Sequence, residues 1–345
     1  MTHRERVLAT FRFEQPDRLA YDLMEGIVWP ELTEYFRAQH GLQEPGDVLE
    51  FLDTDFRWTF MCYVRPQPDP PLAPPAQPAP VTFTRPVATG PLAAASTVAE
   101  VEAYSWPDPR WWQPADCAEV RRQWPDHALV FSAGWQPLFW SACEAFGVEE
   151  ALVKMHWEPQ VIEAFLQRQH EHYLDCLSRG LAAAQGFCDI CWLGDDFSSQ
   201  QSMILSPKQW RQFIKPRLAE QVALARQHGL LVLYHSCGAV RPVLGDLADI
   251  GVNGHLVFQT SATGMEPESI AREFGGRLVF YGGLDVQQLL SYGSLEEVAA
   301  TVARNARAFA DCGGYVVANS HHCVATIKGA NVEAMCRAAR EWRFP

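Results

Sequence analysis

Short apolar runs alternate with longer helical stretches over the second part of the chain. The apolar runs, which predict buried β-strands, lie at 128–132, 187–193, 231–234, 254–258, 277–281 and 315–318. The stretches between them, which predict helices, lie at 140–154, 159–184, 207–228, 239–250, 266–274, 294–312 and from 331 onward. This alternation is typical of βα units with a parallel sheet, and the number of units favours a (β/α)8 TIM barrel.

The first third of the chain is less regular. Thr2 and Glu5 predict a helix cap, and the first helix should end before Pro16. A strand at 17–22 and a helical region at 29–53 are expected next. Residues 66–91 are rich in proline and almost uncharged, which predicts a surface arm outside the core. We therefore expect one barrel domain over 1–345, with an N-terminal extension and this Pro-rich excursion.

Composition excludes several classes of protein. The formal net charge of −13 argues against nucleic acid as a main partner, because binding phosphates needs clustered lysine and arginine. No apolar run approaches the length of about 20 residues that a membrane span needs. The 10 cysteines have no regular spacing, which favours reduced thiols and a cytoplasmic location.

The stretch LLVLYHSCG at 230–238 carries the most specific chemistry. His235 and Cys237 lie where an apolar strand ends, and strand alternation turns both side chains to the same face. An imidazole and a thiolate so placed are half of a tetrahedral zinc site. His321, His322 and Cys323 follow the strand at 315–318, and the sequence leaves open which of them is the third ligand.

Polar and aromatic residues follow the other predicted strands too. In a barrel, groups at the carboxyl ends of several strands gather on one rim. The candidates, besides the metal ligands and the acidic residue Asp22, are Glu25, Trp135, Asp195, Asp196, Tyr234, Gln259 and Asp285.

These candidates have more than one interpretation. Asp195 and Asp196 fit acid–base catalysis, hydrogen bonding to a substrate, or helix capping. Glu25 is either a substrate-facing acid or a solvated loop charge. Trp135 is either a core residue or a wall of an apolar substrate pocket. We expect Trp135, Tyr234, Gln259 and Asp285 to bind substrate, and Asp195, Asp196 and Glu25 to be catalytic.

Several segments resemble the uroporphyrinogen decarboxylase superfamily. They are YHSCGAVRPVLGDLADIGVNG, FGGRLVFYGGLDVQQLLSYGSLEEVAATV, GGYVVANSHH with the later ANVEAM, and GDDFSSQQSMILSPKQWRQFIKPRL. The fold of that superfamily is a (β/α)8 barrel. Its decarboxylases carry an arginine-rich N-terminal segment that binds substrate carboxylates. The corresponding segment here, LAYDLMEGIVWPEL, has no arginine and offers Asp22 and Glu25, which would repel a polycarboxylate.

The resemblance is therefore to the cobalamin-dependent methyltransferase branch. It implies a zinc-dependent enzyme that moves a methyl group between a small substrate and a separate corrinoid protein, which supplies the cobalamin. The substrate would be an O-methylated aromatic compound or a thiol acceptor. The implied zinc ligands are His235, Cys237 and Cys323, with His321 as the alternative by spacing. The resemblance also implies a homodimer, and the alternative function is a metal-free decarboxylase or lyase on the same barrel.

Overall fold

The computed structural model describes residues 1–64, 89–323 and 325–345. Most of the Pro-rich arm predicted at 66–91 lies outside these ranges. The main sheet has eight parallel strands in the order β1-β10-β9-β8-β7-β6-β5-β2. They are β1 (Ala20–Tyr21), β2 (Phe56–Phe60), β5 (Ala128–Ser132), β6 (Ile190–Gly194), β7 (Leu231–His235), β8 (Gly254–Phe258), β9 (Val279–Leu284) and β10 (Tyr315–Asn319).

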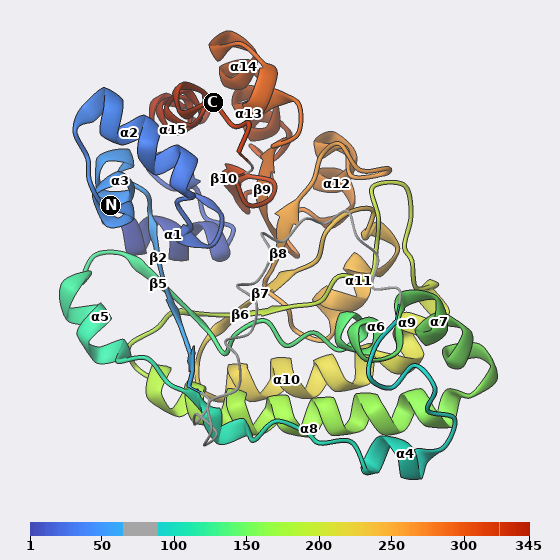
Figure 1. Cartoon of the computed structure of the whole chain (residues 1–345). Coiled ribbons are helices and arrows are strands. Elements are labelled where there is room, and N and C mark those ends of the chain that lie inside the picture. The colour runs from blue at the N-terminus through green and yellow to red at the C-terminus, as the bar shows by residue number, and fades with distance from the viewer. Residues whose placement is uncertain (65–88, 324) are drawn as a thin grey trace.

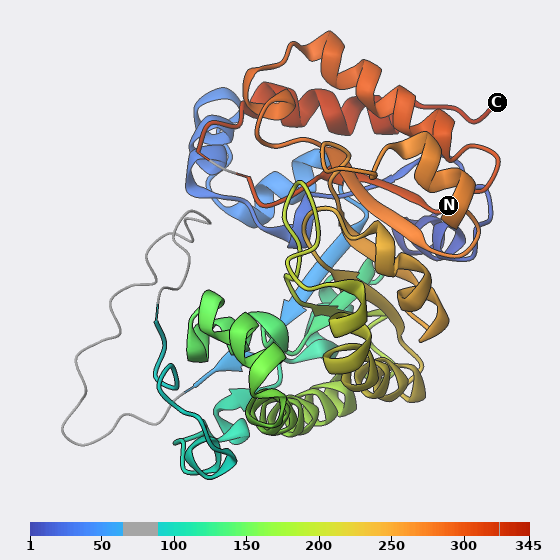
Figure 2. The same cartoon turned by 90° about the vertical axis from the view of Figure 1, so that its right-hand side faces the viewer.

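The helices form a layer outside the curled sheet (Figure 1). They include α1 (His3–Phe11), α2 (Pro30–His40), α3 (Pro45–Leu52), α4 (Val98–Glu102), α5 (Cys117–Gln123), α6 (Phe139–Phe146), α7 (Val148–Trp157), α8 (Pro159–Ala184), α9 (Pro207–Phe213), α10 (Lys215–Gln227), α11 (Arg241–Asp249), α12 (Pro267–Phe274), α13 (Leu289–Tyr292), α14 (Leu295–Ala308) and α15 (Gly329–Glu341). Helices α8 and α10 lie side by side on one flank, and α14 and α15 lie on the opposite flank (Figures 1 and 2). The expected TIM-barrel class is confirmed.

Two buried clusters follow from strand alternation. Side chains such as Val130, Leu233 and Val316 pack in the barrel interior, where Val7 and Phe11 of α1 join them. The alternate side chains pack outward against the helices. Helix α1 therefore covers the amino-terminal end of the barrel, and the carboxyl ends of the strands form the opposite rim.

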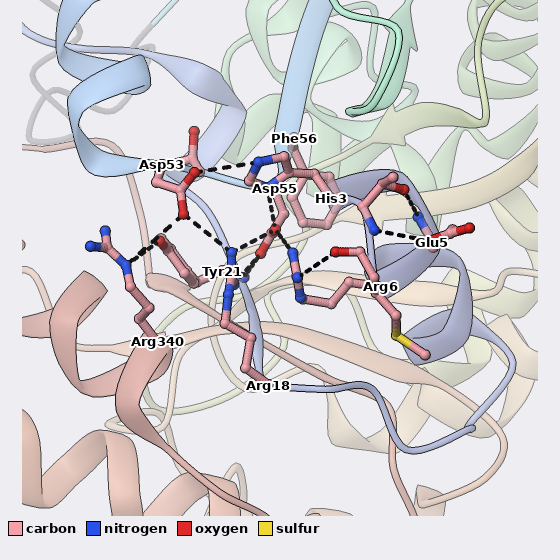
Figure 3. Close-up of polar contacts among 12 residues, drawn as sticks. His3, Glu5, Arg6, Arg18, Tyr21, Asp53, Asp55, Phe56 and Arg340 are labelled. Atoms are coloured by element: carbon pink, nitrogen blue, oxygen red, sulfur yellow. Dashed lines mark hydrogen bonds and ion pairs between the residues drawn. The ribbon is translucent and has the colours of Figure 1, made fainter.

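The ends of the sheet meet at a seam between β1 and β2. The backbone amide of Asp55 donates to the carbonyl of Tyr21 at 3.0 Å, and the amide of Tyr21 donates to the Asp55 carboxylate at 2.9 Å. The same carboxylate is fully buried and accepts hydrogen bonds from Arg6 and Arg18, and it also contacts His3 (Figure 3). One side chain thus links α1 and both strands of the seam.

The chain also has shorter elements near the rim. These are the two-stranded pair β3 (Cys62–Tyr63) and β4 (Trp112–Gln113), and the 3-10 turns η1 (Met24–Gly26) and η2 (Pro109–Trp111). Within the described ranges, no helix combines the length and apolar character needed to cross a bilayer.

Several predicted boundaries differ from the structure. Strand β2 is absent from the prediction, because its sequence FRWTF contains a buried arginine, Arg57, within an otherwise short apolar run. The strand expected at 187–193 begins only at Ile190, since Phe187 and Cys188 belong to the turn that ends α8. Strand β9 continues through Gly282 and Gly283, both with positive φ, beyond the predicted end at 281.

Candidate metal centre

His235, Cys237 and His321 come together at the rim. Each offers one ligand atom, and these atoms all lie within 4.8 Å of one another. His235 is the last residue of β7, Cys237 follows two residues later, and His321 lies two residues beyond β10. The sulfur of Cys237 is 3.6 Å from Nε2 of His235. Two imidazoles and a thiolate suit a zinc site with an open position.

The predicted ligand Cys323 lies elsewhere. It is buried, and its sulfur accepts a hydrogen bond from the side-chain amide of Asn319 at 3.7 Å. Among the described residues the group of three contains His321, so the alternative given by spacing fits the geometry better. His322 points instead to Glu25, with Nε2 2.8 Å from Oε2.

The protonation states of the group depend on burial. Burial, together with the neighbouring His235 and His322, lowers the pKa of His321 to about 3. Its ring is therefore neutral at pH 7, as a metal ligand requires. Burial, together with Asp196 and Glu25, raises the pKa of the Cys237 thiol. A thiolate at Cys237 consequently needs a nearby cation to stabilise it.

Glu25 supports the group from the barrel interior. Its Oε1 lies 3.2 Å from Nδ1 of His235, and its Oε2 contacts His322. Burial alone would raise the pKa of Glu25, but its contacts with the two histidines lower it to about 2. Glu25 is a buried acid rather than a solvated loop charge.

The two adjacent aspartates have different roles. Oδ1 of Asp196 accepts a hydrogen bond from the amide of Cys237 at 2.9 Å and lies 3.7 Å from Nε2 of His235. Asp195 instead caps α6, since it accepts from the amides of Phe139 and Trp140 at 2.7 and 3.0 Å. Asp196 thus lies in the site, whereas the position of Asp195 favours the capping interpretation.

Aromatic rings form one wall of the site. Trp135 and Trp192 lie 5.3 and 5.8 Å from the ring of His235, and 5.8 Å from each other. Trp135 remains 38% exposed, which leaves part of its ring available at the mouth of the barrel. Gly194 permits this packing, because a Cβ there would come within 2.9 Å of Trp135 and of His235. Trp192 was missed, although its spacing from Ile190 and Gly194 places it on the inner face of β6.

The remaining predicted substrate-binding residues support the fold. Gln259 accepts hydrogen bonds from the amide of Gly238 and from Gln200, both at 2.8 Å, and donates to the carbonyl of Ser320 at 3.4 Å. It thereby joins the loops that carry Cys237 and His321. Asp285 accepts from the amide of Gln288, at the start of α13. Tyr234 is packed in the outer core, because it alternates with the inward-facing His235. Substrate binding by Gln259, Asp285 and Tyr234 stays a prediction.

Asp22 is a second buried acid inside the barrel. Its Oδ2 accepts hydrogen bonds from Trp58 Nε1 and from the hydroxyl of Tyr281, each at 2.8 Å. Its Oδ1 has no hydrogen-bond partner among the described residues. Burial outweighs these hydrogen bonds and raises the pKa of Asp22 to about 7.

Because the pKa of Asp22 is raised, the effect of Asp22→Asn on the stability of the folded protein should depend on pH. The folded protein should lose stability as the pH rises from about 4, the usual pKa of an unfolded aspartate, toward 7. The asparagine variant does not titrate there, so its stability relative to the parent should improve by a few kcal/mol between pH 5 and pH 8. Urea unfolding of both proteins at the two pH values measures this change. An equal difference at both pH values would contradict the prediction.

One family profile and several solved structures are similar to this chain. The sequence profile of the family described as uroporphyrinogen decarboxylase (URO-D) matches residues 138–342. A methyltransferase from Methanosarcina mazei has a similar structure, with a TM-score of 0.62, 17% identity and coverage of 99% of each chain. A D-psicose 3-epimerase from Clostridium cellulolyticum H10 gives a TM-score of 0.37 at 11% identity, covering 70% of this chain and 83% of its own. No curated protein is significantly similar in sequence.

Proposed function

This chain belongs to the uroporphyrinogen decarboxylase family, and we propose that it is a zinc-dependent methyltransferase of a corrinoid system. The methyl group would pass between a small substrate and a separate corrinoid protein. The observation that carries the proposal is the group of His235, Cys237 and His321, whose ligand atoms lie within 4.8 Å of one another. The whole-chain likeness to a solved methyltransferase supports it at the level of the fold.

The donor set fits zinc. Zinc prefers nitrogen and sulfur ligands, and three protein ligands leave a fourth position for a substrate atom. The neutral imidazole of His321 and the need of Cys237 for a nearby cation are consistent with this assignment. When bound, zinc would act as a Lewis acid that stabilises a thiolate or polarises an ether oxygen.

The surrounding residues suggest how a substrate is held. Trp135 and Trp192 offer flat apolar surfaces beside His235, which suit an O-methylated aromatic compound or the apolar part of a thiol. Asp196 lies close enough to the ligands to exchange a proton with the substrate heteroatom. The segment around Glu25 lacks the arginines that a polycarboxylate would need. We also propose that the enzyme works in the cytoplasm. Two copies of the chain would form a homodimer.

Methyl transfer tests the proposal directly. The zinc-loaded protein is mixed with methylcobalamin and 2-mercaptoethanol, and separately with cob(I)alamin and 2-methoxyphenol, while cobalamin absorbance is recorded. We expect turnover in one direction, and a loss of at least about 100-fold in His321→Ala because a ligand is removed. Cys312→Ser is the matched control, since Cys312 follows α14, away from the rim. No turnover by the zinc-loaded parent in either direction would refute the proposal.

A metal-free decarboxylase or lyase on the same barrel is the second candidate. Asp22 favours it, because a buried carboxyl group with a pKa of about 7, and with one oxygen that has no hydrogen-bond partner among the described residues, is suited to proton transfer near neutral pH. Asp195, one of the acids first considered for this chemistry, accepts hydrogen bonds from the amides of Phe139 and Trp140 at the start of α6. Measuring metal content together with activity separates the two candidates, because the decarboxylase hypothesis predicts full activity without zinc.

A further inference from the structure

We infer that Glu25 is the positioning residue of the metal centre, holding the His235 ring so that its Nε2 faces Cys237 and His321. This inference deepens the proposed function and rests on it. Glu25 would not touch the metal or the substrate. It acts through the two histidines that its carboxylate contacts.

The two nitrogens of His235 face different partners. Nδ1 lies 3.2 Å from Oε1 of Glu25, and neither atom has another hydrogen-bond partner among the described residues. Nε2 lies 3.6 Å from the sulfur of Cys237 and 3.7 Å from Asp196. A neutral imidazole carries one proton, and a carboxylate at Nδ1 keeps it there. The lone pair of Nε2 then faces the sulfur of Cys237.

The second oxygen of Glu25 reaches the other ligand loop. Oε2 lies 2.8 Å from Nε2 of His322, the residue directly after the ligand His321. One carboxylate therefore contacts a ligand on the β7 side and the neighbour of a ligand on the β10 side. Such a bridge fixes the distance between the two loops as well as the angle of one ring.

The backbone around Glu25 is arranged to hold this position. Glu25 has φ 58° and ψ 16°, a left-handed conformation that is unusual for a residue with a side chain. The preceding amide, of Met24, donates to the side chain of Asn319 at 3.0 Å, at the end of β10. The following residue, Gly26, packs against Trp58, where a Cβ would come within 2.8 Å. The turn is thus fixed on both sides with the carboxylate pointing inward.

Zinc affinity of Glu25→Gln tests the inference. We measure the dissociation constant of zinc by competition with a chromophoric chelator, and expect it to weaken about 10- to 100-fold, the usual effect of losing such a partner. The visible spectrum of the cobalt-substituted protein should change as well, because the His235 ring is no longer fixed. Glu31→Gln is the matched control, since Glu31 is exposed on α2. It should keep the affinity and the spectrum of the parent.

Two further variants make the test decisive. His322→Asn removes only the second contact of Glu25 and should weaken zinc binding less than Glu25→Gln. Glu25→Asp keeps the charge but shortens the side chain, and replaces Glu25→Gln if the latter fails to fold. We expect it to weaken zinc binding because the carboxylate is withdrawn from Nδ1.

The outcomes are distinguishable. Parental zinc affinity and cobalt spectrum in Glu25→Gln, or in Glu25→Asp where that variant replaces it, would overturn the role of Glu25 and leave the proposed function standing. A parent protein that binds no zinc would overturn the proposed function itself.

Discussion

Cys237→Ser is expected to reduce the zinc content from about one ion per chain to less than about a tenth of an ion, because a serine hydroxyl is a poor replacement for a thiolate ligand. The loss should be large because Cys237 supplies the only sulfur in the group of three. The fold should survive, since Cys237 lies on a loop beyond β7 rather than inside a strand. Elemental mass spectrometry of purified protein gives the metal content, and circular dichroism checks the fold.

The control for this result is Cys312→Ser. Cys312 is partly buried like Cys237, but its sulfur donates hydrogen bonds to the carbonyls of Phe309 and Gly313. This variant should retain about one zinc ion per chain, because it leaves all three ligands in place. Full zinc content in Cys237→Ser would exclude the group of three as the metal site. If neither the parent nor any variant contains metal, the result would favour the hypothesis of a metal-free decarboxylase or lyase.

Asp55→Asn should lower the free energy of unfolding by about 3 kcal/mol, because it removes a buried negative charge that pairs with two buried guanidinium groups. Asp55 is fully buried and pairs with Arg6 at 2.7 Å and with Arg18 at 2.9 Å (Figure 3). Arg6 keeps its second partner, Asp17, which limits the loss. Urea unfolding at pH 7 measures the change.

Asp249→Asn provides the comparison for Asp55→Asn. Asp249 also pairs with an arginine, Arg277, but its side chain is 65% exposed. Its removal should cost less than about 1 kcal/mol, as is usual for exposed ion pairs. Equal effects of the two substitutions would show that the buried network contributes no more than a surface pair.

The acid dependence of stability should also involve Asp55. Burial alone would raise its pKa, but His3, Arg18 and Arg6 outweigh burial and lower it. A lowered carboxyl pKa stabilises the folded state above about pH 4 and loses this contribution as the pH falls further. The parent should therefore lose stability below pH 4 more steeply than Asp55→Asn.

The sequence predicted the helices and strands that a short run of neighbouring residues marks. Strand β5 and helix α8 agree with the prediction at both ends, because an apolar run or a proline start marks them clearly. His235 and Cys237, which the sequence analysis paired by strand alternation, lie 3.6 Å apart at Nε2 and Sγ, although Cys237 follows the end of β7. Strand β2 was missed because Arg57 is buried by contacts that the sequence does not display, including a cation–π contact with Trp124.

The third residue of the candidate metal group, His321, depends on a turn that no local pattern encodes. Beyond β10 the chain places His321 toward Cys237, while Asn319 binds the carbonyl of His321 and the sulfur of Cys323. The position of Glu25 likewise depends on tertiary contacts. Its left-handed backbone conformation is one that local preference would assign to glycine. Aspartates 195 and 196 are adjacent in sequence, yet only their packing distinguishes the cap from the site residue.

The short β1 strand has a consequence for motion. It pairs with β10 over only two residues, and it meets the β2 side through Asp55 rather than through a full ladder. Local opening begins where few backbone hydrogen bonds hold an element. Amide hydrogen exchange should therefore be fastest, among the strands of the barrel, at Ala20 and Tyr21. The segment bearing Glu25 follows directly, so the same transient opening would loosen its hold on His235.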